Sequence, residues 1–243
     1  MLQVGLRCKE DATRKLTFTG SGFVLVQAQV LTALDATIHR QPPAEPPPIT
    51  FEDVLAGADA SAVALPSNNS ARLMAENRLI MLLRDFISER PSDYDTSRLT
   101  FAEAFSKMVQ AGAKRTSIFD HNACFVLCDF MEEALGIFIR FQYSHALGCD
   151  FIDWRFWMDV CKRILDSQHS MSEIRLFAFL YGAWNVITHD DRRKEILCLE
   201  WLVKEETFDK FFTHWCPMVR AYYMRLLCWR LCQDDGEATD LDA

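Results

Sequence analysis

Histidine and cysteine side chains at helical spacing are the first residues of this chain that could do chemistry. His121, Cys124 and Cys128 lie at i, i+3 and i+7, so a helix would place them on one face. Imidazole and thiolate groups are good zinc ligands, and a fourth ligand could come from Cys161 or Cys149 across a helix pair. However, zinc sites usually contain close cysteine pairs in loops, and free cysteine is among the most buried residue types. The pattern therefore favours core packing over a metal site.

A second group of histidine and cysteine lies near the C-terminus. His214 and Cys216 precede Pro217, and Cys228 and Cys232 are one helical turn apart. These side chains could assemble a metal site, but small core residues on the last helix explain the pattern better. We therefore predict no metal site and no other cofactor.

The His189-Asp190 dipeptide resembles the metal-holding pair of all-helical, metal-dependent phosphohydrolases. Such an enzyme uses a cation to lower the pKa of water, and His169 and Asp209 are the available further ligands. The dipeptide also lies where a turn between helices is expected, and aspartate is a common helix cap. Capping is the better interpretation, with the hydrolase as the least favoured alternative. Because no Gly-rich phosphate loop or serine nucleophile elbow occurs, we predict that the protein is not an enzyme.

The C-terminal half contains two copies of one apolar pattern. When the sequence is aligned with itself at an offset of 45 residues, large apolar residues coincide, and Trp184 aligns with Trp229. A period near 45 residues with two helices per unit is typical of HEAT or armadillo-like arrays. We therefore predict an all-α fold of stacked helical hairpins, a short HEAT/armadillo-like solenoid, with repeats at about 150–189 and 195–233.

Basic residues in these repeats are the remaining candidate contacts. Arg175 and Arg220 occupy equivalent positions in the two copies, so they could form a ladder between repeats or contact a partner. Arg192, Arg193 and Lys194 form one tight basic cluster that could meet an acidic partner or a lipid headgroup. A solvated helix start is the commoner explanation of such a cluster.

Proline and charge patterns divide the chain into three segments. Residues 1–69 are predicted to be poorly ordered, apart from a helix at 23–39 that a Pro-rich linker follows. Residues 70–233 are predicted to form one helical domain, and residues 234–243 an acidic disordered tail.

Three helices are predicted before the repeats. Their ranges are 71–88, 101–110 and 117–143. Gly112 is expected to end the second helix, and Gly136 to interrupt or kink the third. Ser170 and Glu173 read as a capping box that opens the second helix of the first repeat.

A family resemblance is carried by two segments, SEIRLFAFLYGAWNVI from Ser172 and EILCLEWLVKEETFDKFFTHWCPMVRAYYMRLLCWRLC from Glu195. They resemble the end of a fungal family of uncharacterised proteins that is defined by a domain of unknown function. Members are sometimes labelled membrane proteins and are generally much longer than this chain. The resemblance covers about residues 115–233, and it assigns no catalytic residues.

Composition narrows the class of function. A net charge of −8 argues against a general nucleic-acid or anionic-lipid binder and leaves local basic patches as the candidate contacts. Nine cysteines without a secretory signal indicate a reduced, cytosolic or nuclear setting, of which we favour the cytoplasm. The longest nearly uncharged run in the repeats, 176–188, is shorter than the roughly 20 residues that a spanning helix needs. We predict a helical scaffold for protein–protein interaction, with self-association through apolar ends that include Trp215, Tyr222, Tyr223 and Trp229. The alternative is a peripheral membrane or trafficking adaptor.

Overall fold

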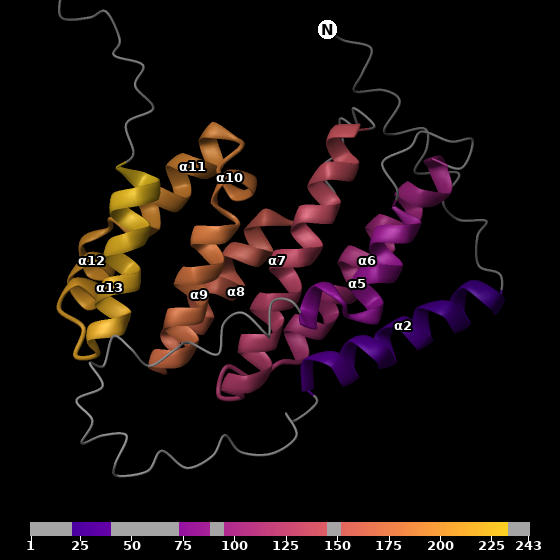
Figure 1. The fold of residues 1–243 in the computed structure, drawn as a ribbon, viewed down its shortest axis with the longest axis horizontal. Helices are drawn as coiled ribbons and strands as arrows, with labels where there is room; N and C mark the ends of the chain where they lie inside the picture. Colours follow the sequence, from indigo (N-terminus) through magenta and orange to yellow (C-terminus); the bar gives the residue numbers. More distant parts are fainter. Residues whose placement is uncertain (1–20, 40–72, 88–94, 145–151, 233–243) are drawn as a thin grey trace, which may run out of the picture. The chain divides into compact units, whose positions relative to one another are not determined.

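The computed structural model describes residues 21–39, 73–87, 95–144 and 152–232. Every regular element within these ranges is a helix, so the predicted all-α class is confirmed for this part of the chain (Figure 1). The chain divides into two compact units, Met1–Ser167 and Gln168–Ala243, and each is described by itself.

Five helices make up the described part of the first unit. They are α2 (Ser21–His39), α5 (Arg78–Phe86), α6 (Asp95–Arg115), α7 (His121–Ser144) and α8 (Trp154–Asp166). Helix α2 packs against α5, α6 and α7, and α5 packs against α7 (Figure 1). Phe105 of α6 lies at the centre of the core, with ring centroids 6.4 Å from Phe130 and 6.3 Å from Phe138.

Two predicted helix boundaries in this unit are wrong. Helix α6 runs through Gly112 rather than ending there, because the glycine lets α2 approach closely: a Cβ at Gly112 would lie 3.3 Å from side-chain atoms of both Leu34 and Ile38. The helix predicted at 71–88 is broken, and α5 begins after Asn77, whose side chain accepts a hydrogen bond from the Leu79 amide at 2.9 Å.

The two other helices predicted for this unit are present. The helix predicted at 23–39 is α2, which spans Ser21–His39. The long helix predicted at 117–143 is α7, but the interruption predicted at Gly136 is wrong, because α7 is one α-helix from His121 to Ser144. Residues 1–20, 40–72 and 233–243, which hold the Pro-rich linker and the acidic tail, lie outside the described residues. The predicted division at residues 69 and 233 stays a prediction.

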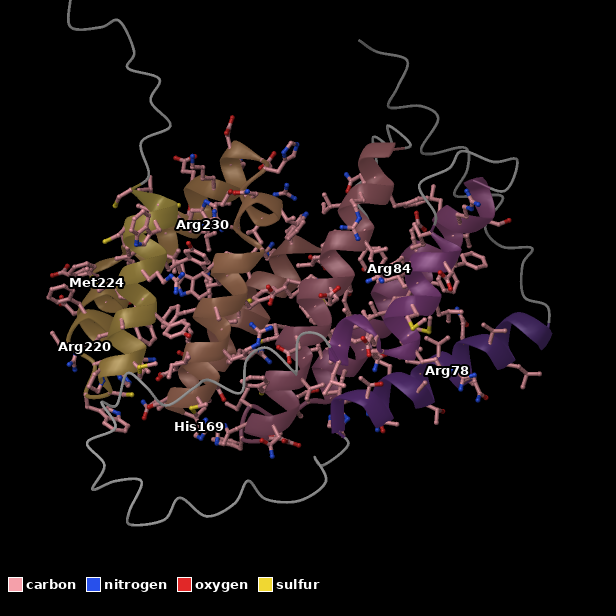
Figure 2. The ribbon with its side chains drawn as sticks, viewed as in Figure 1. Arg78, Arg84, His169, Arg220, Met224 and Arg230 are labelled. Carbon is pink, nitrogen blue, oxygen red and sulfur yellow. The ribbon has the colours of Figure 1, made fainter. Side chains whose placement is uncertain are left out.

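The second unit is built around two neighbouring helices, α9 (Ser170–Gly182) and α13 (Pro217–Leu226), which pack against each other. His169 and Arg220 lie toward one end of this unit and Arg230 toward the other, so α9 and α13 run in the same direction (Figure 2). The remaining elements are α10 (Trp184–Ile187), α11 (Asp191–Leu197), η3 (Cys198–Leu202), α12 (Glu205–Phe212) and η4 (Leu227–Leu231). Both η elements are π-helical turns.

Aromatic rings hold the second unit together. Phe177, Phe211 and Tyr223 meet with ring centroids 5.0–5.6 Å apart. The Tyr223 hydroxyl donates a hydrogen bond to the Leu202 carbonyl at 2.5 Å, and burial raises the pKa of Tyr223 to about 12. The prediction that Tyr223 is an exposed apolar end is therefore wrong, because its ring fills the core while Trp215 and Trp229 are exposed.

The two predicted repeats differ in detail. Trp184 is 5% exposed, but its counterpart Trp229 is 65% exposed, since no described element follows η4 to cover it. At the 45-residue offset α8 aligns with residues 199–211, so the single helix α8 corresponds in the second copy to two pieces, η3 and α12, which are separated at Val203 and Lys204. The solenoid therefore remains a proposal.

Candidate functional site

The feature of the second unit with the most unusual chemistry is a buried carboxylate beside an imidazole. Glu173, in the first turn of α9, has no exposed side-chain surface, and its Oε2 lies 3.3 Å from Nε2 of His214. His214 lies in the connection between α12 and α13. The pair therefore links residues that are 41 positions apart in the sequence.

Hydrogen bonds around His214 define its orientation. Its Nδ1 accepts a hydrogen bond from the Cys216 amide at 3.1 Å, so the proton of the neutral ring lies on Nε2, the atom that faces Glu173. Its backbone carbonyl accepts a hydrogen bond from the guanidinium of Arg220 in α13. The imidazole also stacks on Phe211, with ring centroids 6.2 Å apart.

Burial raises the pKa of Glu173, and the nearby charges of His214 and Lys210 oppose that rise. Within the described residues, neither carboxylate oxygen of Glu173 receives a hydrogen bond. A buried carboxylate without donors favours its protonated form. The arrangement is suited to a pH-sensitive tether between α9 and the α12–α13 connection rather than to catalysis, because Glu173 is closed off from any substrate.

The histidine and cysteine face predicted on the third helix lies on α7, but its thiols are in the core. Burial, followed by the charge of Asp120, raises the pKa of Cys124 to about 11, and its thiol donates to the Ser117 carbonyl at 3.5 Å. Burial also raises the pKa of Cys161 to about 12. Among the described residues, no group of three or more His, Cys, Asp or Glu side chains is placed to hold a metal, and Cys149 lies outside them.

Two of the residues considered for a phosphohydrolase, Asp190 and His169, cap helices. The Asp190 side chain accepts a hydrogen bond from the Arg193 amide at 2.9 Å and caps α11, as the capping interpretation predicts. His169 caps α9 by accepting a hydrogen bond from the Ser172 amide. The capping box predicted at Ser170 and Glu173 is therefore wrong, because His169 is the cap and Glu173 points into the core.

The basic cluster of Arg192, Arg193 and Lys194 lies on the first turns of α11, where Arg192 and Lys194 are exposed. Of the two predicted ladder residues, Arg220 bonds to carbonyls of its own copy, those of His214 and Trp215. The ladder and the contact role of the cluster stay predictions.

The first unit carries an apolar surface on α2. Val30, Leu34 and Ile38 form the buried face of this helix. Its other face exposes large apolar side chains. These are Val24 (56% exposed), Leu25 (70%), Val26 (52%) and Leu31 (39%). Beside them, a groove of about 350 Å³ lies between α2 and α6, and it is lined mainly by apolar atoms of side chains that include Leu31 and Met108.

A comparison with protein families matches residues 105–231 to the family described as "Protein of unknown function (DUF1765)". The match covers more than half of the 243 residues. The chain belongs to this family. The predicted resemblance to a fungal family defined by a domain of unknown function is confirmed.

A relative of this DUF1765 chain in Schizosaccharomyces pombe bears the name UPF0592 membrane protein. The two are 40% identical over 126 residues, which is 51% of this chain and 13% of the relative. The chain thus spans a small part of that protein's length. No solved structure matches. No helix in the described ranges is both long and apolar enough to cross a membrane.

The DUF1765 segment contains the Glu173–His214 pair, whereas α2 lies outside it. Sequence reasoning missed the pair because it treated Glu173 as a capping residue and grouped His214 with cysteines. One signal could have found it: Glu173 is the only acidic residue between Asp166 and Asp190, in a mainly apolar helix whose other charged residue is Arg175. An isolated carboxylate in such a helix needs a partner.

Proposed function

We propose that the protein is a non-enzymatic helical scaffold, located in the cytoplasm, that binds other proteins through apolar helix surfaces. The observation that carries this proposal is the exposed face of α2, where Leu25 is 70% exposed beside an apolar groove. Contiguous apolar surface of this kind is typical of interaction sites, since water contact with it is unfavourable.

The architecture that we propose for the scaffold is a short stack of helical hairpins. Its support is the side-by-side, same-direction packing of α9 and α13, the second helices of the two sequence copies (Figure 1). Ile174 and Val219, which occupy equivalent positions, are both buried. Equivalent helices of successive repeats pack in this way in helical solenoids.

The occupant that we propose for the α2 surface is a second copy of the chain. A two-fold interface places the same patch against itself, so any charge in the patch would meet its own copy. Asp35 is the only charged residue of α2 apart from its terminal His39, and it pairs with Arg115 at 3.5 Å. The exposed residues from Val24 to Val26 are uncharged, and the adjoining groove holds one residue of each charge, Glu103 and Lys107, which permits self-pairing.

Sedimentation velocity over a range of protein concentrations tests this proposal. We expect the wild type to form dimers as concentration rises, and Leu25→Gln combined with Leu31→Gln to remain monomeric. The control is Met171→Gln combined with Leu199→Gln, which removes exposed apolar side chains from the second unit and should still dimerise. A wild type that stays monomeric, or a control that dissociates equally, contradicts the proposal.

A peripheral membrane or trafficking adaptor is the second candidate. It is favoured by the exposed cations of α11, Arg192 and Lys194, and by the relative whose name describes a membrane protein. Basic clusters at a membrane surface are attracted to anionic lipids. Flotation with anionic liposomes tests it: the wild type should float, and the triple alanine variant of Arg192, Arg193 and Lys194 should not. A wild type that fails to float removes this candidate.

A further inference from the structure

Two arginines of the second unit converge on one tyrosine ring. The guanidinium carbon of Arg225 lies 5.0 Å from the ring centroid of Tyr181, and that of Arg230 lies 4.3 Å from it. Tyr181 is near the end of α9, while Arg225 belongs to α13 and Arg230 to η4. The packing of α9 on α13 therefore gathers two positive charges at one place.

The π-helical turn η4 explains why both arginines reach the same ring. In an α-helix, residues five apart are separated by about 140° around the axis and face different directions. In η4 the Cys232 amide bonds to the Leu227 carbonyl at 2.8 Å, an i to i+5 bond that widens the turn. The wider turn brings Arg230 back toward the side of Arg225. Such π-turns are frequent at functional sites.

Nothing on the two supporting elements neutralises this pair. The chain contains no Asp or Glu at residues 174–189 or 210–232, which include Tyr181 and both arginines. Within the described residues, neither Arg225 nor Arg230 forms an ion pair, and Nε of Arg230 is buried without a hydrogen-bond acceptor. Arg225 is exposed and Arg230 is partly exposed, so an anion can reach this positive charge, and its binding would stabilise the arrangement.

Two guanidiniums held on one tyrosine ring suit a phosphomonoester. Each guanidinium presents planar donors that bind phosphate oxygens in pairs. A phosphomonoester carries a charge of about −1.5 to −2 at neutral pH, which matches two arginines, whereas one carboxylate carries a single charge. Tyr181 holds both guanidiniums by cation–π attraction, which leaves their donor edges available.

The residue before Arg230, Trp229, indicates that such a phosphate lies at a membrane surface. Trp229, next to Arg230 on η4, is 65% exposed. Tryptophan beside cations is typical of surfaces that lie at the headgroup level of a membrane. We propose that Tyr181, Arg225 and Arg230 bind the phosphomonoester of a phosphorylated lipid headgroup, while Trp229 inserts into the membrane interface. This proposal does not depend on the α2 surface or on the basic cluster of α11.

Cosedimentation with vesicles tests the proposal. The vesicles consist of phosphatidylcholine with either a phosphatidylinositol phosphate or phosphatidylserine, matched in total negative charge. We expect the wild type to prefer the phosphatidylinositol phosphate, and Arg225→Gln combined with Arg230→Gln to lower its affinity about thirtyfold. Equal binding to both kinds of vesicle overturns the proposal, because it indicates attraction to charge alone.

Two further variants separate a built site from diffuse charge. Arg78→Gln combined with Arg84→Gln removes the same charge from α5 and should leave binding unchanged. Arg225→Lys combined with Arg230→Lys keeps the charge but not the paired donors, so it should bind more weakly than the wild type and more tightly than the glutamine variant. Full binding by the lysine variant, or equal loss in the α5 variant, contradicts the site. Circular dichroism checks that each variant is folded.

The source of the phosphate is resolved with a soluble inositol phosphate and a phosphoserine peptide. Trp229→Ala should weaken binding to vesicles but leave titration with the soluble inositol phosphate unchanged. If Trp229→Ala has no effect on vesicles, the membrane part of the proposal is wrong. If the peptide binds in an Arg225- and Arg230-dependent manner and vesicles do not, the ligand is a phosphoprotein and the lipid assignment is overturned.

Discussion

The Nε2 atom of His214 lies 3.3 Å from Oε2 of Glu173, whose side chain has no exposed surface. This contact joins the start of α9 to the connection that precedes α13. Burial raises the pKa of Glu173, so this carboxyl keeps its proton to a higher pH than an exposed glutamate does.

The first prediction concerns how this carboxyl affects stability. A folded-state pKa above the unfolded one means that the folded protein holds more protons between the two values, so the free energy of unfolding falls as pH rises through that window. The window begins near the ordinary glutamate pKa of about 4.3 and ends at the raised value. Glutamine is neutral and similar in shape to glutamate. Glu173→Gln should therefore remove this fall in the free energy of unfolding with rising pH.

Urea unfolding at a series of pH values measures the effect. The difference in stability between Glu173→Gln and the wild type should grow in favour of the variant as pH rises through the window. Glu206→Gln is the control, because Glu206 pairs with Lys204 at the surface and should leave the profile unchanged. Parallel profiles for Glu173→Gln and the wild type would show that Glu173 does not titrate differently in the folded protein.

The second prediction concerns the hydroxyl of Tyr223. It donates to the Leu202 carbonyl from a fully buried position, so Tyr223→Phe leaves that acceptor without its donor. We expect a loss of about 1–2 kcal/mol in the free energy of unfolding. Tyr222→Phe, at the partly exposed neighbouring position, should change stability by less than about 0.5 kcal/mol. Thermal unfolding by circular dichroism compares the two, and equal effects would contradict the role of the hydrogen bond.

The third prediction uses two helical glycines of the first unit, Gly112 and Gly136. Gly112→Val forces a branched side chain against Leu34 and Ile38, which should lower stability by about 1–3 kcal/mol. A Cβ at Gly136 would meet only the end of the Arg140 side chain, at 3.9 Å. Gly136→Ala should therefore raise stability by about 0.5–1 kcal/mol, since alanine favours the helix. Stabilisation by both substitutions would show that α2 does not constrain Gly112.

Apolar periodicity predicted the helices but not the residues on which their packing depends. The existence of the helix at 23–39 and of the long helix at 117–143 could be predicted because both are local patterns, whereas the continuity of the long helix at Gly136 was not predicted. The continuation of α6 through Gly112 could not be predicted, because the glycine is required by α2, which lies far away in the sequence. Likewise, the Glu173–His214 pair and the convergence of Arg225 and Arg230 on Tyr181 arise only from the packing of α9 against α13. The π-turn η4 has no sequence signal that we can identify.

The last prediction distinguishes cysteines in the core from cysteines at the surface. Burial raises the pKa of Cys124 to about 11 and that of Cys161 to about 12, while Cys228 and Cys232 are exposed. Alkylation requires the thiolate and access to it, so iodoacetamide at neutral pH should label the exposed pair first. Quantitative mass spectrometry over a time course measures the order of labelling. In urea the four should react at similar rates, which controls for differences in peptide detection. Rapid labelling of Cys124 in the folded protein would contradict its burial and would reopen the metal interpretation of the α7 face.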